Sequence, residues 1–266
     1  VYYFPGCGAG LFYPAIGLAG LMLLLRAGVA VIMPKEHLCC GYPLLASGSE
    51  EAFTTNQARN IYAIKKQIED AQVEGIRATT ILTSCGTCRD GLQRYDMDTL
   101  VGGKLKHMDV VQFLLERGPG FSIPGPEKLL YHGSCHAEWT GVHKAKAAGQ
   151  YRSALANITG SDVTLSPGCC GESGMGALTS PKIYNRLRAR KQEQLSKDLL
   201  HAGDQAPLLV GCPSCKIGIS RSIMAMKRET SVLHTLEFLA ASLYGEGWRE
   251  QFVAKLRRLA DALEAG

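Results

Sequence analysis

The sequence Leu38-Cys39-Cys40-Gly41-Tyr42-Pro43 places two adjacent cysteines before a glycine, and Cys169-Cys170-Gly171 repeats this triplet 130 residues later. A single cysteine precedes each triplet by 32 or 34 residues, and a Cys-x-x-Cys motif follows each triplet by just over 40 residues. The chain therefore carries two series of five cysteines in the same order. They are Cys7, Cys39, Cys40, Cys85 and Cys88, then Cys135, Cys169, Cys170, Cys212 and Cys215.

The repeat extends beyond the cysteines. Corresponding cysteines lie 127 to 130 positions apart, and Val111-Gln112-Phe113-Leu114 lies 125 positions before Leu236-Glu237-Phe238-Leu239. Similarity at a nearly fixed spacing indicates an internal duplication. Turn-forming residues cluster in Gly118-Pro119-Gly120 and Pro124-Gly125-Pro126, so the seam is expected there. We therefore expect two domains, residues 1–122 and residues 123–266, each with one cysteine series.

Short apolar runs precede the cysteine motifs. They lie at 1–4, 29–33, 79–83, 128–132, 162–165 and 207–210, with helical patterns most evident at 50–72, 143–157 and 181–201. This alternation predicts an α/β protein of two tandem halves, each with a small parallel sheet. Because the loops that follow parallel strands share one edge of a sheet, each cysteine series is expected to meet at the carboxyl ends of its strands.

Composition and charge limit the class of protein. With 266 residues and 46% hydrophobic side chains, the chain can bury a full core. Its formal charge of +5 comes from Lys and Arg scattered without a basic block, which argues against a nucleic-acid partner. Pro14, Gly17, Gly20 and Arg26 interrupt the most apolar stretch, residues 11–33, which predicts a buried helix followed by a strand and no transmembrane segment.

The cysteine content also bears on the compartment. Ten cysteines without a visible export signal favour metal ligation in a reducing cytoplasm over disulfides. The chain enters directly into the strand-like Val1-Tyr2-Tyr3-Phe4, so we interpret it as a segment of a longer protein. Any association with the inner membrane is then expected to be peripheral, through partners.

Each half offers one thiol more than an ordinary metal site needs. Four thiolates satisfy a cubane iron-sulfur cluster or a tetrahedral zinc site. Two interpretations remain open: an irregular cluster that uses all five thiolates, or a conventional cluster with one free cysteine. Structural zinc is a further alternative, although zinc ligands are usually grouped in a short segment and these are spread over about 80 residues. A disulfide scaffold is disfavoured, because vicinal cysteines bridge to each other poorly.

Glycines and two cations accompany the cysteines. Glycine permits tight turns and the close approach of backbone N-H groups to sulfur. Glycines that adjoin a cysteine include Gly6, Gly41, Gly86, Gly168, Gly171 and Gly211. Arg89 and Lys216 directly follow the Cys-x-x-Cys motifs, where a cation at a helix start would stabilise an anionic cluster. Ordinary solvent-facing charges are the alternative for both residues.

Three polar residues and one helix are further candidates. His132 and His136 flank Cys135 and offer alternative ligands, proton donors or hydrogen-bond partners, although a buried structural histidine is the simpler interpretation. Glu172 follows the second triplet and could relay protons, but an acidic residue at a helix start explains it equally well. Residues 248–264 have apolar side chains at helical spacing, which predicts an amphipathic helix packed on its own domain.

The two cysteine series resemble the CCG-domain family over essentially the whole chain. Two complete copies in order are a far more specific signal than one Cys-x-x-Cys motif. The family includes the B subunit of heterodisulfide reductase, the cysteine-rich subunit of anaerobic glycerol-3-phosphate dehydrogenase, and iron-sulfur components of glycolate and lactate oxidation. In the first of these, each series binds a non-cubane [4Fe-4S] cluster. The resemblance therefore implies two such clusters, held by the ten cysteines.

Finer matches point to one subgroup. Four stretches are similar to the C-terminal part of large bacterial fusion proteins: Tyr3-Phe4-Pro5-Gly6-Cys7, Leu38-Cys39-Cys40-Gly41-Tyr42-Pro43, Ser84-Cys85-Gly86-Thr87-Cys88 and Cys169-Cys170-Gly171-Glu172-Ser173-Gly174. In those proteins a flavin-binding D-lactate or glycolate dehydrogenase-like region and a ferredoxin-like segment precede the CCG domains. Two departures concern Ser134, where the family commonly has proline, and the longer stretches before each Cys-x-x-Cys motif.

The resemblance implies an iron-sulfur electron-transfer module of an oxidoreductase. Electrons from a D-2-hydroxy acid would arrive from FAD on an upstream or partner domain, through a ferredoxin-like domain, and leave to a quinone or another acceptor. Two alternatives stay open. The two clusters could cleave a disulfide or heterodisulfide, which requires a cleft that reaches both. A structural zinc-binding assembly module would contain zinc without iron or sulfide.

Overall fold

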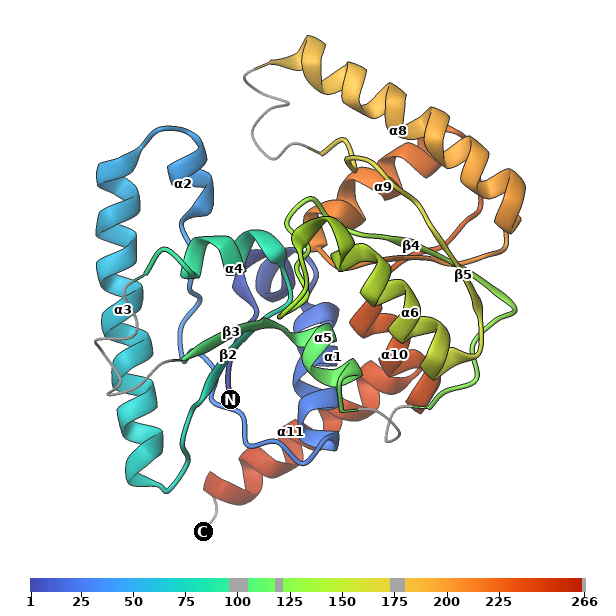
Figure 1. Cartoon of the computed structure of the whole chain (residues 1–266). Coiled ribbons are helices and arrows are strands. Elements are labelled where there is room, and N and C mark those ends of the chain that lie inside the picture. Colours follow the sequence, from blue (N-terminus) through green and yellow to red (C-terminus); the bar gives the residue numbers. More distant parts are fainter. Residues whose placement is uncertain (96–104, 118–121, 173–179, 265–266) are drawn as a thin grey trace.

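Two parallel β-sheets form the framework of the computed structural model, which describes residues 1–95, 105–117, 122–172 and 180–264 (Figure 1). The first sheet has the order β1-β2-β3 and the second the order β5-β4-β6-β7. The α/β class predicted from the sequence is confirmed. Residues 118–120 of the expected seam, and Ser173 and Gly174, lie outside the described residues. The strands are β1 (Tyr2–Phe4), β2 (Thr80–Thr83), β3 (Lys106–Asp109), β4 (Lys128–His132), β5 (Asp162–Leu165), β6 (Leu208–Val210) and β7 (Val232–His234).

The two sheets repeat one arrangement. In the first sheet Tyr3 of β1 lies opposite Leu82 of β2, and in the second Tyr131 of β4 lies opposite Leu209 of β6. Tyr3 and Tyr131 are 128 positions apart, and Leu82 and Leu209 are 127 positions apart, which matches the spacing of the cysteines. The duplication inferred from the sequence therefore extends to strand order and register.

The predicted strand at 29–33 is wrong except at Ile32, which forms a single parallel bridge to Tyr2. Ile32 donates its N-H to the Val1 carbonyl and accepts from the Tyr3 N-H. Pro34 has no N-H with which to continue this ladder, so pairing stops there. Strands β3 and β7 were not predicted from the sequence, because both are short edge strands whose polar residues hide the usual alternation.

Helices cover both faces of each sheet (Figure 1). One set packs with the core that contains Tyr3, Leu82 and Tyr131, and the other with the core that contains Tyr2 and Phe4. This division follows from β-strand geometry, in which successive side chains point to opposite faces. The first set is α1 (Pro14–Arg26), α5 (Val110–Leu115), α6 (Ala147–Thr159), α10 (Thr235–Tyr244) and α11 (Trp248–Glu264). The second is α2 (Tyr42–Ala46), α3 (Glu50–Val73), α4 (Gly86–Leu92), α8 (Pro181–Ala202) and α9 (Pro213–Ala225).

The two halves pack through reciprocal pairs of helices. Helix α1 of the first half packs against α10 of the second, and α5 of the first packs against α6 of the second. The amphipathic helix predicted at 248–264 forms as α11, which buries Trp248 and Phe252. It packs on α10 of its own half, as expected, and also on α1 of the first half. The reason is that its apolar face meets the core that both halves share.

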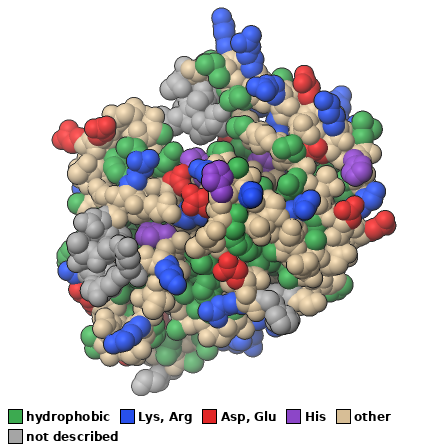
Figure 2. Space-filling view, viewed as in Figure 1, with side chains coloured by type: hydrophobic (Ala, Val, Ile, Leu, Met, Phe, Trp, Pro, Cys, Tyr) green, Lys and Arg blue, Asp and Glu red, His purple; other side chains and the backbone are tan. Residues whose placement is uncertain are grey.

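The surface gives no sign of a single basic patch on the face drawn in Figure 2, where Lys and Arg side chains are dispersed among acidic and uncharged ones. No helix within the described ranges combines the length and apolarity needed to cross a bilayer.

Candidate metal centres

The first cysteine series comes together at the carboxyl edge of the first sheet. The Cys7 thiol contacts Cys39, Cys40 contacts Cys39 and Cys88, and Cys88 contacts Cys85. Three separate segments supply these thiols: the turn after β1, the loop before α2 and the start of α4. A donor set of five adjoining cysteines is chemically suited to a soft metal or an iron-sulfur cluster.

The backbone of the Cys39-Cys40 pair is held by side chains from α3 and from the segment after α4. The amides of Asn56 and Asn60 donate to the Cys39 carbonyl at 2.9 and 2.6 Å, and the Tyr95 hydroxyl donates to the Cys40 carbonyl at 3.0 Å. These bonds fix the sharp turn that two vicinal ligands need. They also satisfy carbonyl groups that the turn leaves outside regular secondary structure.

The second cysteine series is less symmetrical than the first. Cys169, Cys170, Cys212 and Cys215 adjoin one another through side-chain contacts. Cys135 instead is exposed and interacts with His136, which in turn pairs with Asp90 of the first half. The structure thus brings four members of this series together and places Cys135 at the surface beside them.

The contacts among the thiols favour ionisation at Cys39 and Cys85 in the first site and at Cys170 in the second. Hydrogen bonds with Cys212 and Cys88 lower the pKa of Cys85. Hydrogen bonds from Cys40 and Cys7 lower the pKa of Cys39, and contacts with Cys169 and other neighbours lower the pKa of Cys170. Metal ligands must be thiolates, so sites in which neighbours stabilise a thiolate fit the role.

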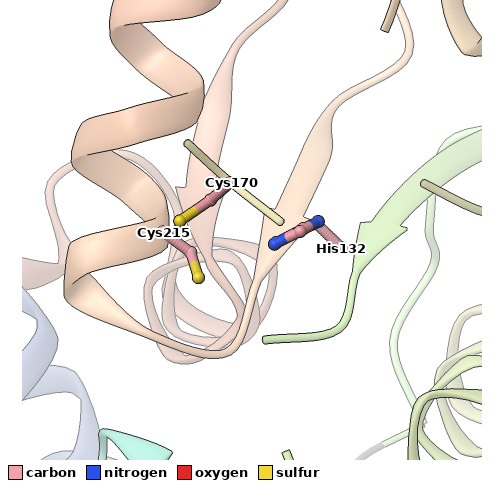
Figure 3. Close-up of side chains that lie close together, drawn as sticks. All are labelled: His132, Cys170 and Cys215. Carbon is pink, nitrogen blue, oxygen red and sulfur yellow. The ribbon is translucent and has the colours of Figure 1, made fainter. Parts of the chain in front are cut away.

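A histidine completes the surroundings of the second site. His132, at the end of β4, is fully buried. One ring nitrogen and the sulfur atoms of Cys170 and Cys215 lie within 4.8 Å of one another, and Figure 3 shows a ring nitrogen directed at the two sulfurs. His132 is predicted from the sequence as an alternative ligand, and the structure places its ring close enough to the Cys170 and Cys215 sulfurs to share a metal with them.

The two sites adjoin each other across the interface between the halves. The sulfur atoms of Cys85 and Cys212, corresponding members of the two series, lie 3.5 Å apart, and both residues are buried. Next to this contact, the His234 imidazole Nε2 lies 3.2 Å from the Ser84 carbonyl oxygen. The duplication therefore places the two Cys-x-x-Cys motifs back to back.

The two predicted cations are directed toward carboxylates. Arg89 is buried and donates to the His136 carbonyl at 2.9 Å, with Glu138 at 3.1 Å. Lys216 pairs with Glu237. The Arg89 contacts join the two halves, and the Lys216 ion pair joins α9 to α10 within the second half. The effect of both cations on a cluster remains a prediction.

The predicted glycines occupy crowded or left-handed positions. Gly6 has φ +65°, and a Cβ there would lie 2.6 Å from the Cys88 sulfur. Gly41 has φ +75° and precedes α2. A Cβ would meet the His136 carbonyl at Gly86 and the Arg188 backbone at Gly171, and at Gly211 it would lie 3.2 Å from the Tyr131 hydroxyl. Gly168 has φ +87° and open space around it.

Two glycines inside helices α4 and α9 were not predicted as part of the sites. A Cβ at Gly91 would lie 3.1 Å from the Cys40 carbonyl oxygen, and one at Gly218 would lie 2.8 Å from the Cys170 carbonyl oxygen. Each glycine therefore admits the vicinal cysteines of its own half against the helix. A sequence signal for them exists, because both motifs extend to Cys-x-x-Cys-x-x-Gly.

Replacing Gly218 with alanine is expected to lower iron and sulfide content at the second site and to reduce the free energy of unfolding by about 1–3 kcal/mol, because a methyl group would push the Cys170 backbone away. Iron and sulfide analysis and urea unfolding measure the two effects. The control is Gly149→Ala in α6, where a Cβ would have open space. It is expected to be neutral or stabilising by about 0.5–1 kcal/mol. Equal cluster content in both variants would contradict the packing role of Gly218.

Two features border the second site on the outside. A cavity of about 470 Å³ is lined by Gly168, Cys169 and Lys191 together with neighbouring α8 residues. Glu172, the predicted proton relay, forms an ion pair with Arg221 at 2.9 Å. Burial raises the pKa of Glu172.

Known proteins with similar sequences are iron-sulfur proteins and oxidoreductase components. An uncharacterised iron-sulfur protein of Methanococcus maripaludis is 22% identical over 90% of this chain and 46% of its own length. The glycolate oxidase iron-sulfur subunit of Escherichia coli is 27% identical over 92% of this chain and 58% of its own length. Lactate utilization protein A of Bacillus cereus is 26% identical over 90% of this chain and 98% of its own length.

The chain spans about half the length of the first two of these relatives. Together they support iron-sulfur clusters as the cofactor, which the cysteine donor sets fit. The family model of the cysteine-rich domain, CCG, matches residues 1–93 and 129–220, one match for each cysteine series. The chain belongs to the cysteine-rich CCG domain family.

Proposed function

We propose that this chain is an iron-sulfur electron-transfer module with two [4Fe-4S] clusters of the non-cubane type. The two domains, residues 1–122 and 123–266, would hold one cluster each. Cys7, Cys39, Cys40, Cys85 and Cys88 would bind the first cluster, and Cys169, Cys170, Cys212 and Cys215 would bind most of the second. Cys135 is the fifth cysteine predicted for that series. The contacts among the thiols support this assignment.

The contact between Cys85 and Cys212 is the observation that carries the proposal. Iron-sulfur clusters accept and release single electrons when bound. The edge at which the two sites meet is shielded from water, since Cys85, Cys88, Cys212 and Cys215 are each at most 6% exposed. Two redox sites that share a buried edge are suited to passing an electron from one to the other. The glycines beside the ligands, with Arg89 and Lys216 nearby, would stabilise the anionic clusters.

The relatives support an assignment of partners by their names. They include the iron-sulfur subunit of a glycolate oxidase and Lactate utilization protein A, both described above. We therefore assign the electron donor to FAD on an upstream or partner domain that oxidises a D-2-hydroxy acid such as lactate or glycolate. A ferredoxin-like domain would connect it to this chain. A quinone or similar acceptor would receive the electrons, with the protein in the cytoplasm or peripheral at the inner membrane through its partners.

One observation favours a second candidate, the reduction of a disulfide or heterodisulfide. Cys169 is exposed and lines the cavity of about 470 Å³, so a small molecule could reach the second site. A disulfide reductase that uses both clusters needs access to each. The cavity borders only second-half residues, and a separate one beside Gly6 and Leu38 borders the first site. This separation supports electron relay over disulfide cleavage.

The first test is metal analysis of the anaerobically purified gene product that contains this chain. We expect iron and acid-labile sulfide in nearly equal amounts, with an absorbance that bleaches when a D-2-hydroxy acid is added under anaerobic conditions. Zinc without iron or sulfide would overturn every redox assignment and favour a structural zinc module. Iron-sulfur clusters that a disulfide oxidises, and that a D-2-hydroxy acid leaves unreduced, would favour the reductase.

A further inference from the structure

The second site contains a buried nitrogen that the cysteine pattern does not explain. His132 is fully buried, and its Nε2 has no hydrogen-bond partner within the described part of the chain. A polar atom left in this state costs free energy unless something else binds it. The ring lies beside Cys170 and Cys215, with one nitrogen directed at their sulfurs (Figure 3).

The surroundings of the imidazole set which nitrogen carries the proton. Nδ1 of His132 lies 3.0 Å from the Ser166 carbonyl oxygen, which can only accept. Lys191 donates to the Ser166 hydroxyl at 2.8 Å and to the Pro167 carbonyl at 2.9 Å, and the Ser166 hydroxyl donates to Asp198 at 2.7 Å. Lys191 Nζ also lies 3.3 Å from Nδ1, but its shorter contacts are those to Ser166 and Pro167. The shorter contact of Nδ1, to the Ser166 carbonyl, places the proton on Nδ1, so that Nε2 presents a lone pair. Metal-bound histidines typically donate their other ring N-H to a carbonyl or carboxylate in this way.

The first half supplies a natural comparison. Phe4 lies three residues before Cys7, and His132 lies three residues before Cys135, so the two residues correspond in the duplication. Both side chains are fully buried at the end of corresponding strands, β1 and β4. In the first half the lone Cys7 reaches the other thiols, whereas in the second half Cys135 is exposed beside His136. The half that lacks an inward lone cysteine is the half with an inward histidine.

We propose that His132 binds the second cluster through Nε2 and supplies the fifth donor, in the place that Cys7 fills at the first site. The inference rests on the proposed iron-sulfur function. The Ser166 carbonyl holds the imidazole in the required tautomer through its contact with Nδ1. A neutral imidazole in place of a thiolate makes the second site less negative, which raises its reduction potential. Electrons would then move from the first site to the second.

The test is magnetic resonance on the reduced protein grown with 15N-labelled histidine. The expected result is a strong hyperfine coupling from one directly bound histidine nitrogen. His132→Phe, which places the first-half residue in the second half, removes this coupling. The matched control His136→Phe retains it, because His136 pairs with Asp90 and is not the imidazole beside Cys170 and Cys215. Cys135→Ser retains both the coupling and the second cluster.

Two outcomes would overturn the inference while leaving the proposed function in place. Wild-type protein with two intact clusters and no directly bound histidine nitrogen would remove the ligand role of His132 and leave the electron-transfer proposal standing. A Cys135→Ser variant that loses the second cluster, beside a His132→Phe variant that keeps it unchanged, would assign the fifth position to Cys135. Protein that binds no iron at all would instead remove the proposed function together with this inference.

Discussion

Cys40→Ser is expected to lose the first cluster and keep the second, and Cys170→Ser is expected to do the reverse. Each is the buried second member of a vicinal pair. Cys40 contacts Cys88, and Cys170 contacts Cys215, in the Cys-x-x-Cys motif of the same half. A serine hydroxyl is a harder and far less acidic ligand than a thiol, so it is a poor substitute on iron. Iron and sulfide should fall by about half in each variant.

The same variants test how close the two sites are. In fully reduced wild-type protein we expect the electron paramagnetic resonance spectrum to show magnetic interaction between the clusters, since Cys85 and Cys212 are in contact. Each single variant should give the spectrum of one isolated cluster. Each variant is the control for the other, because the unaltered site must stay loaded. Wild-type spectra that equal the sum of the two variants would contradict adjacent clusters and the proposed relay.

The cysteine spacing predicted much of this architecture because the duplication is written in it. Cysteines after strand-like runs located most of the parallel strands, and parallel strands imply a shared edge. The failures have local causes. Strands β3 and β7 contain only four and three residues, and they carry Lys106, His107 or His234 where an alternating apolar pattern would be expected. Ile32 pairs at one bridge only, beside Pro34.

The arrangement of the halves could not be predicted from the sequence in the same way. The apolar residues of α1 and α10 indicated only that each helix is buried. The spacing of the cysteines contains no information on which helices pack against each other. The difference between the two sites was equally hidden. Cys7 and Cys135 hold the same place in their series, yet one joins the other thiols and one faces solvent. That outcome depends on packing around His132 and His136, which spacing alone does not specify.

Arg89→Ala is expected to lower the free energy of unfolding by about 3–5 kcal/mol, the largest stability effect of any change considered. The guanidinium side chain is 3% exposed and links the first half to His136 and Glu138 of the second. Alanine would leave the His136 carbonyl without this donor and remove a cation whose charge opposes the rise in the pKa of buried Asp109. Urea unfolding of the loaded protein, followed by circular dichroism, measures the loss.

The control and the pH dependence separate this interface from an ordinary surface charge. Arg228→Ala removes an ion pair with Asp204 in which both side chains are more than a third exposed, and such pairs contribute about 0–1 kcal/mol. Burial raises the pKa of Asp109 from 3.8 to about 6, so its contribution is most favourable below pH 4 and is lost as pH rises through 6. Without the charge of Arg89, burial destabilises the ionised Asp109 carboxylate more strongly. The loss of unfolding free energy in Arg89→Ala should therefore be larger at pH 8 than at pH 5. A deficit equal to that of Arg228→Ala at both pH values would contradict a buried, charge-balancing role and make Arg89 a surface residue in energetic terms.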